Sequence, residues 1–272
     1  MFPVIVCIAK KEHEYIEEFV RYHLALGFKY IFIYDNEDTP TYKELLKKYD
    51  GYIYVFHTPH NHFQKGIQMI ILDDFKKYIM NTEITHVAHI DIDEFIVLKK
   101  HANICDFIAE YIVGECQAIG MNWRFFGSSG KTEKTDEPVT MRFTMCQKDG
   151  HELIKTLFKK DNFLGYNYTP HNIILSSGYT TTTTGCIIPE YSNLNIDFSV
   201  IQLNHYKCKT LPEFRYIRQR GRSDQPIHNQ SFENVDEDFK KYDMNEIEDL
   251  TAYNFYKNNC LRMPFDETPG SS

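Results

Sequence analysis

Short apolar runs alternate with helical patterns in the N-terminal part of the chain. Phe2–Ala9 is apolar throughout, and after it Ile16, Phe19 and Leu24 recur at helical spacing before Gly27, which fits a helix C-cap. The same rhythm continues to residue 90. It predicts strands at Phe2–Ala9, Tyr30–Tyr34, Tyr52–Phe56 and Ile84–Ile90, with helices between them at about residues 16–26, Pro40–Asp50 and Gly66–Met80.

These strands are apolar along their whole length and not only at alternate positions. Such strands are typical of a sheet that is buried on both faces. Strands that alternate with helices in this way predict an α/β fold with a mostly parallel central sheet flanked by helices. Ligands of such sheets bind at the carboxyl ends of the strands.

Beyond residue 115 the predicted elements are shorter and are separated by polar loops. No linker rich in Pro, Gly or Ser divides the chain and no segment repeats, so we expect one domain. The pattern predicts strands at Gln117–Trp123, Met141–Met145, Leu153–Phe158, Asn172–Leu175 and Val200–Tyr206, and helices at Leu211–Arg220 and Asn234–Lys257.

Composition and charge narrow the classes of function. Hydrophobic residues make up 42% of the 272 residues and charged residues 25%, which excludes a disordered or coiled-coil chain. The 38 acidic residues outnumber the 30 basic residues, and the net charge of −8 argues against nucleic acid as a partner. Seven cysteines without a C-x-x-C pair favour a reducing compartment. No basic region precedes the apolar run Phe2–Ala9, which Lys10 and Lys11 follow at once, and the run is too short to span a bilayer. We therefore interpret it as a strand and expect a cytoplasmic protein.

Acidic residues follow two of the predicted strands. Asp35–Asp38 ends the second strand and Asp91–Glu94 ends the fourth. If Asp91 and Asp93 lie in a strand, their side chains project to the same side and can share one divalent cation. A hard cation of this kind binds phosphate oxygens, so the pattern predicts a metal and diphosphate site at this edge.

At this point the sequence resembles the family-2-like glycosyltransferases of the GT-A fold. Several blocks in the same order carry the resemblance, which spans most of residues 3–225. Lys11 departs from the pattern, because asparagine is more usual before Glu12. The blocks are Cys7–Glu12 with Tyr15–Phe19 and Tyr22–Gly27, Tyr34–Asp38, Gln68 with Asp73, Phe75 and Tyr78, His89–Phe95, Trp123–Lys131, Lys155–Lys159, Asn204–Tyr206 and Arg220–Asp224.

The resemblance implies a single GT-A domain over residues 1–272. Its nucleotide-sugar-binding half would be 1–115, its acceptor-side half 116–230 and its C-terminal helical segment 231–272. It implies a hexosyltransferase that uses Mn²⁺ or Mg²⁺ and a nucleoside-diphosphate sugar, of which a UDP-sugar is favoured. The acceptor would be a glycan, a lipid-linked glycan or a glycoprotein. The matching positions are Ala9, Glu12, Asp35, Gln68, Asp91, Lys155 and Arg222 for the donor, and Asp91, Asp93 and His205 for the metal.

Two of these assignments have structural alternatives. His205 ends an apolar run and is either a metal ligand or a core histidine. Arg215, Arg218, Arg220 and Arg222 form a basic cluster that is a solvated helix face, a clamp for the diphosphate, or a contact with anionic lipid at a membrane surface.

An inverting transfer, which we favour, needs a carboxylate that takes the proton of the acceptor hydroxyl. The candidates are Asp224, Glu94 and Asp136, and Asp224 ranks first because it adjoins the basic cluster. A retaining mechanism needs no such base and stays open. The aromatic triplet Trp123, Phe125 and Phe126 is either part of the core or a stacking platform for an acceptor sugar.

Two rival functions share this pattern. A sugar nucleotidyltransferase would have the same fold and metal, but such enzymes usually have a glycine-rich loop after the first strand, and Ala9–Glu12 contains no glycine. A non-catalytic carbohydrate-binding protein with a decayed site would bind metal and nucleotide weakly or not at all. The sequence does not determine the oligomeric state.

Overall fold

The computed structural model describes residues 1–59, 66–166, 169–219 and 234–266. Within them, one mixed nine-stranded sheet forms the centre of the molecule, with the order β3-β2-β1-β4-β8-β6-β12-β5 and with β11 also paired to β6. These strands are β1 (Pro3–Ala9), β2 (Tyr30–Asp35), β3 (Ile53–His57), β4 (His86–His89), β5 (Glu94–Leu98), β6 (Cys116–Phe125), β8 (His151–Lys159), β11 (Tyr179–Thr181) and β12 (Ile201–His205).

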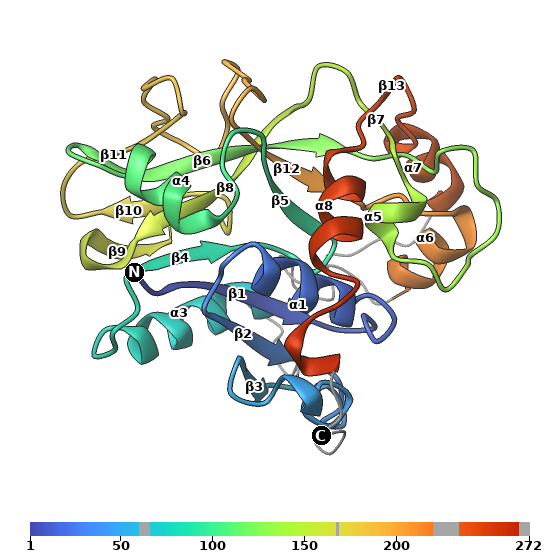
Figure 1. Cartoon of the computed structure of the whole chain (residues 1–272), viewed down its shortest axis with the longest axis horizontal. Helices are drawn as coiled ribbons and strands as arrows, with labels where there is room; N and C mark the ends of the chain where they lie inside the picture. The colour runs from blue at the N-terminus through green and yellow to red at the C-terminus, as the bar shows by residue number, and fades with distance from the viewer. Residues whose placement is uncertain (60–65, 167–168, 220–233, 267–272) are drawn as a thin grey trace.

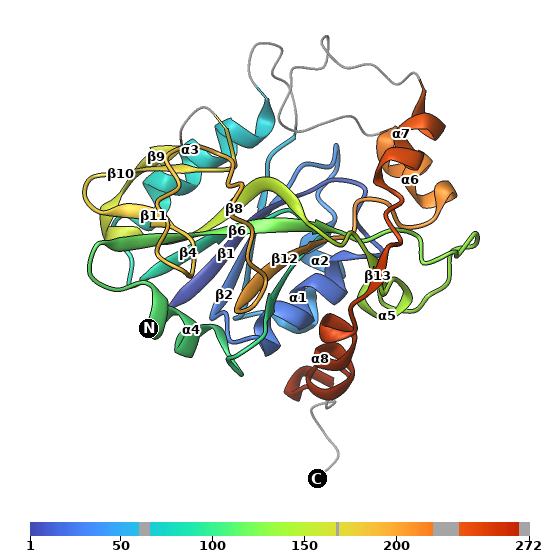
Figure 2. The same ribbon diagram turned by 90° about the horizontal axis from the view of Figure 1, so that it is seen from above.

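Helices cover both faces of this sheet (Figures 1 and 2). Seen from above, α3 and the β9–β10 hairpin lie on one face, while α1, α4 and α8 lie on the other (Figure 2). The helices are α1 (Ile16–Ala25), α2 (Tyr42–Leu45), α3 (Ile67–Ile79), α4 (Ile104–Tyr111), α5 (Val139–Arg142), α6 (Leu211–Arg218), α7 (Val235–Tyr242) and α8 (Thr251–Asn259). The hairpin joins β9 (Phe163–Tyr166) and β10 (Ile173–Leu175), and a second small sheet joins β7 (Met145–Cys146) and β13 (Ile247–Glu248).

Alternate residues of the first strands enter two separate cores. In β1, Ile5 and Cys7 pack under α1, whereas Val4 and Val6 pack under α3. The same alternation places Ile33 and Phe32 of β2 in opposite cores. The prediction of an α/β fold with a mostly parallel sheet flanked by helices is confirmed, since β1, β2, β3 and β4 pair in parallel.

The carboxyl ends of the parallel strands meet at one edge of the sheet. Ala9 pairs with Asp35, and Asp35 with His57, so β1, β2 and β3 end side by side. β8 runs antiparallel to both β4 and β6, and β12 runs parallel to β6. His205 at the end of β12 and Glu94 at the start of β5 therefore reach this same edge, which we call the carboxyl edge.

Three sequence predictions differ from the structure. The fourth strand ends at His89, so Asp91–Asp93 do not lie in a strand but in a turn before β5, and neither β5 nor α4 was predicted. Met141–Met145 is mostly not a strand, because α5 occupies its first residues. The predicted helix Asn234–Lys257 is two helices, α7 and α8, separated by the strand β13.

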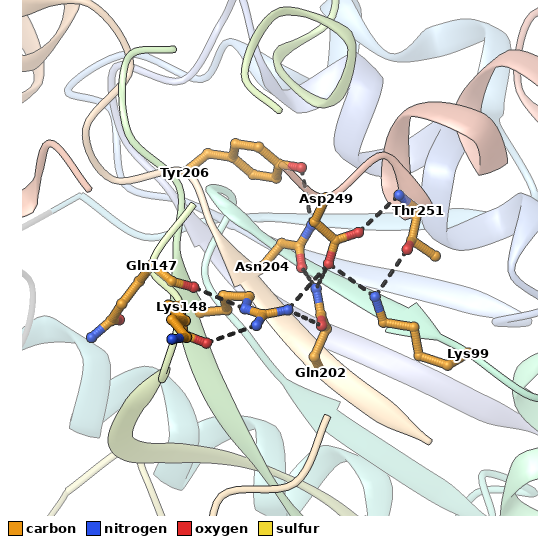
Figure 3. Close-up of polar contacts among 9 residues, drawn as sticks. Lys99, Gln147, Lys148, Gln202, Asn204, Tyr206, Asp249 and Thr251 are labelled. Carbon is orange, nitrogen blue, oxygen red and sulfur yellow. Dashed lines mark hydrogen bonds and ion pairs between the residues drawn. The ribbon is translucent and has the colours of Figure 1, made fainter. Parts of the chain in front are cut away.

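A polar cluster anchors this C-terminal part to the sheet (Figure 3). Asp249 accepts hydrogen bonds from Lys99 Nζ at 2.9 Å and Gln202 Nε2 at 2.9 Å, and it forms an ion pair with Arg124 at 3.3 Å. Thr251 Oγ1 lies 2.9 Å from the same Lys99 Nζ. We call these five residues the C-terminal clasp, because they tie the segment between β13 and α8 to β5, β6 and β12.

Candidate functional site

The turn between β4 and β5 lies at the carboxyl edge, and two hydrogen bonds between its own residues hold it together. Glu94 N donates to Asp91 O at 3.0 Å, and Asp91 N donates to Glu94 Oε2 at 2.8 Å. Tyr206 N donates to Asp93 O at 2.8 Å, which fixes the turn to the end of β12. The turn holds Asp91 and Asp93 in separate environments.

Asp91 lies in a network with Gln68 and Lys155. Lys155 Nζ is 3.0 Å from Asp91 Oδ2, and Gln68 Nε2 donates to Asp91 Oδ1 at 3.2 Å. The Lys155 side chain is only 1% exposed, whereas that of Asp91 is 37% exposed. Both oxygens of Asp91 therefore have protein partners, and the carboxylate still faces solvent.

Charge within this network is distributed unevenly. Burial tends to raise the pKa of Asp91, but Lys155 overrides it and holds this pKa below its usual value. Burial opposes the charge of Lys155, yet Asp91 and Glu94 raise its pKa. The completely buried Glu94 lies 3.9 Å from Lys155 Nζ, and its burial raises its pKa well above the usual value. Asp91 and Lys155 thus stabilise each other's charged forms, whereas burial disfavours the charged form of Glu94.

Gln68 connects Asp91 to a buried histidine. Gln68 stands in the first turn of α3, and its Nε2 lies 3.3 Å from His89 Nε2. Burial lowers the pKa of His89 well below its usual value, so the imidazole is neutral and accepts from the amide. The amide group of Gln68 thereby sets the orientation of Asp91.

Asp93 forms the second half of the site with His205. His205 Nε2 lies 3.5 Å from Asp93 Oδ2, and both side chains are largely buried. Burial lowers the pKa of His205 despite Asp93, which leaves a neutral imidazole. The rings of Trp123 and Phe125 contact this imidazole with centroids at 4.6 Å and 5.1 Å.

The donor set of Asp93 and His205 fits a divalent cation. A carboxylate and a neutral imidazole supply two ligands, and phosphate oxygens and water commonly complete the shell of such ions. His205 Nδ1 is buried without a hydrogen-bond partner among the described residues. No group of three or more candidate metal ligands occurs in the described part of the chain, and Asp91 is held by Lys155.

Three other residues predicted to bind the donor form hydrogen bonds within the protein. Asp35 is buried, and its carboxylate accepts backbone N–H groups from Glu37 at 3.1 Å and from Thr41 at 2.7 Å. The carbonyl of Ala9 accepts from Asn36 N at 2.9 Å, and Glu12 N donates to Tyr42 Oη at 2.9 Å. These contacts shape the loops after β1 and β2. A role for Ala9, Glu12 and Asp35 in donor binding stays a prediction.

The basic cluster on α6 is tied to α7. Arg215 pairs with Asp236 at 2.5 Å and Arg218 with Asp238 at 2.5 Å. These two arginines therefore join the helices instead of forming a clamp of free guanidinium groups. Arg222, like the predicted base Asp224, lies outside the described residues.

The remaining predicted residues lie apart from the acidic turn or are buried. Asp136 is exposed on the loop between β6 and α5. Glu94 is fully buried, which argues against it as a base that meets an acceptor hydroxyl. Trp123, Phe125 and Phe126 belong to the hydrophobic core, and the Trp123 ring also contacts His171 with centroids at 5.1 Å. The triplet thus follows the core alternative and not the stacking platform.

Sequence reasoning missed two neighbours of His205. Lys207 and His151 both lie close enough to influence its charge, and Lys207 also lowers the pKa of His151 after the larger effect of burial. The available signal for Lys207 was its position two residues after His205 in the sequence.

With this geometry in view, comparison with known proteins identifies the family. The model of glycosyltransferase family 92 matches residues 2–251. The chain belongs to glycosyltransferase family 92. The predicted resemblance is therefore confirmed at the level of a glycosyltransferase, while the likeness to family-2-like enzymes with a D-x-D motif stays a prediction. No curated protein matches the sequence.

Two solved structures are similar to this family 92 chain at low sequence identity. Staphylococcus aureus TarS 1–349 is 12% identical, over 80% of this chain and 63% of that chain, with a TM-score of 0.38. UDP-glucose pyrophosphorylase in complex with UDP-glucose is 11% identical, over 59% of this chain and 77% of that chain, with a TM-score of 0.32. The chain thus spans less than two thirds of the TarS chain, and at these TM-scores no residue of the site is assigned from either structure. Across the described residues, no helix combines the length and apolar character needed to cross a membrane.

Proposed function

We propose that this family 92 chain transfers a hexose from a nucleoside-diphosphate sugar to a hydroxyl of a glycan, a lipid-linked glycan or a glycoprotein. The observation that carries this proposal is the Asp93–His205 pair beside Asp91 at the carboxyl edge. A site of this composition suits a diphosphate that is bound together with a hard cation. A UDP-sugar is our first candidate donor.

Asp93 and His205 would hold Mn²⁺ or Mg²⁺, which neutralises charge on a bound diphosphate. Asp91 would face the donor, with Lys155 and Gln68 keeping its carboxylate in place. Glu94 acts in this scheme as a positioning residue, since its side chain holds Asp91 N and has no exposed surface. Lys155 likewise positions Asp91 and does not itself reach the diphosphate.

We favour inversion, with a carboxylate taking the proton of the acceptor hydroxyl as the new bond forms. Asp224 remains the first candidate for this base and Asp136 the second. A peripheral contact with a membrane through Arg222 also remains a proposal, because Arg215 and Arg218 are paired with α7.

The proposal is tested with Mn²⁺ and a panel of sugar nucleotides, by following both nucleoside diphosphate and pyrophosphate. Release of nucleoside diphosphate that depends on an acceptor supports the transfer. Release of pyrophosphate would instead indicate a nucleotidyltransferase, and no product with no binding would indicate a non-catalytic protein. Asp93→Asn should abolish the reaction, whereas Asp161→Asn, an exposed acid after the opposite end of β8, should not.

A further inference from the structure

Lys207 lies two residues after His205 in the chain. β12 ends at His205, and the next amide, that of Tyr206, donates to Asp93 O at 2.8 Å. The backbone that leads into Lys207 is therefore fixed to the acidic turn. Among the described residues, Lys207 is the lysine nearest to His205 in sequence, and Lys209 is the next.

An aromatic ring holds the ammonium group of Lys207. Its Nζ lies 3.8 Å from the centroid of the Tyr242 ring, at the end of α7. The Tyr242 ring meets Phe125 edge-on with centroids at 5.4 Å, and Phe125 in turn contacts His205. Through this series of contacts, Lys207 and His205 belong to one aromatic cluster at the carboxyl edge.

The charge of Lys207 is not neutralised by an acid. Among the residues that the structure describes, no carboxylate forms an ion pair with its Nζ, whereas Lys155 and Lys99 each have one. A cation over an aromatic ring keeps its hydrogen-bond donors available for an anion.

Two other lysines near the carboxyl edge, Lys155 and Lys209, are less suited to meet a ligand. Lys155 is committed to Asp91 and is almost completely buried. Lys209 is 2% exposed, and its Nζ lies over the Tyr15 ring at 4.5 Å. Lys207 is half-buried, so it is both close to His205 in sequence and accessible to solvent.

We propose that Lys207 binds the departing diphosphate and stabilises the charge that develops on it during transfer. The inference rests on the proposed function and adds a catalytic residue to it. In the step considered, the acceptor oxygen forms a bond to the anomeric carbon while the bond from that carbon to the diphosphate oxygen breaks. The electron pair of the broken bond stays on the diphosphate, beside the Lys207 ammonium, and the acceptor proton passes to a carboxylate base.

The role of Tyr242 follows from this assignment. Its ring positions the ammonium through the cation–π contact without touching the diphosphate itself. Tyr242→Phe keeps the ring and should preserve the rate, whereas Tyr242→Leu removes it and should lower kcat by about fivefold. Tyr242 is thus a positioning residue for Lys207.

The test compares Lys207→Met and Lys207→Arg in the full chain with the UDP-sugar that the wild type uses. Lys207→Met should lower kcat by about 100-fold and weaken UDP binding in the presence of Mn²⁺ by about tenfold, because it removes one charged donor. Lys207→Arg should keep kcat within about tenfold of the wild type, since the charge is retained. Lys257→Met is the matched control: Lys257 is exposed on α8 and makes a similar contact with Tyr253 at 5.9 Å.

Two results would overturn the assignment while the proposed function stands. One is wild-type kcat and UDP affinity in Lys207→Met, and the other is equal loss in the Met and Arg variants. If Lys207→Met does not fold, as judged by its melting temperature, equal rates of Tyr242→Leu and Tyr242→Phe would overturn it instead. Failure of the wild type to release nucleoside diphosphate from any sugar nucleotide would refute the proposed function itself.

Discussion

Lys155 Nζ lies 3.0 Å from Asp91 Oδ2, so a buried ammonium group partners the first acid of the D-x-D turn. Because Lys155 is almost completely buried, removal of either partner leaves an uncompensated charge. The pair therefore connects stability to donor binding. Its contribution is best measured with a double-mutant cycle.

Lys155→Met should destabilise the protein by about 2–4 kcal/mol and weaken donor binding, because Asp91 loses the group that orients it. The double variant Lys155→Met/Asp91→Asn should recover part of this stability, since neither charge then remains. Urea unfolding of the wild type, both single variants and the double variant measures the coupling free energy. Strictly additive effects would show that the two side chains do not interact.

Asp93→Asn and His205→Gln should each remove the stabilisation that Mn²⁺ gives together with UDP. A ligand at 100 times its Kd stabilises the folded state by about 2.7 kcal/mol, and this gain should be lost when a metal ligand is lost. The measurement is the melting temperature with UDP alone and with UDP and Mn²⁺. A full Mn²⁺ effect in Asp93→Asn would exclude this residue as a ligand.

The first half of the fold was largely predictable because its strands are apolar and alternate with helices along the chain. β1 and β2 are almost the same residues as the predicted runs. β5 was missed because Glu94–Leu98 follows the acidic turn without any break in the sequence pattern. The predicted helix Asn234–Lys257 failed for a tertiary reason: the residues around Asp249 pair with β7 and join the C-terminal clasp instead of continuing a helix.

Three of the predicted site residues lie at one edge of the sheet, but their geometry was not predicted. The sequence placed Asp91, Asp93 and His205 together, and the structure brings them to one edge. The sequence pattern did not show that β4 stops at His89, because the apolar run continues through Ile90. Nor did it show that Lys155 faces Asp91, since the antiparallel pairing of β8 with β4 joins residues far apart in sequence.

The C-terminal clasp should contribute measurably to stability. The Asp249 side chain is 7% exposed and forms ion pairs with both Lys99 and Arg124. Burial alone would raise the pKa of Asp249, but Thr251 and Lys99 hold this pKa below its usual value. Asp249→Asn leaves two cations without their acid and should lower the free energy of unfolding by about 2–4 kcal/mol. The matched control Glu248→Gln is exposed and should change it little. Urea denaturation measures the free energy of unfolding of the wild type and both variants. Equal values for Asp249→Asn and Glu248→Gln would show that the clasp does not stabilise the fold.

His23 should make the protein less stable as the pH falls. This residue of α1 is buried in the hydrophobic core. Its Nδ1 donates to Phe19 O at 2.9 Å and its Nε2 accepts from Ile96 N at 3.3 Å. Burial lowers its pKa to about 3. The unfolded chain takes up this proton near pH 6.5, so stability is complete above that pH and declines as the pH falls towards 3.

For this one site the loss between pH 6.5 and pH 5 is about 2 kcal/mol. His23→Gln should remove that part of the slope, because glutamine does not titrate, whereas the exposed His57→Gln should leave it unchanged. Urea unfolding at pH 7, 6 and 5 measures the slope for the wild type and both variants. Equal slopes in the wild type and His23→Gln would mean that His23 is protonated within the folded protein, and that the hydrogen bond from Ile96 N to Nε2 is then given up at little cost.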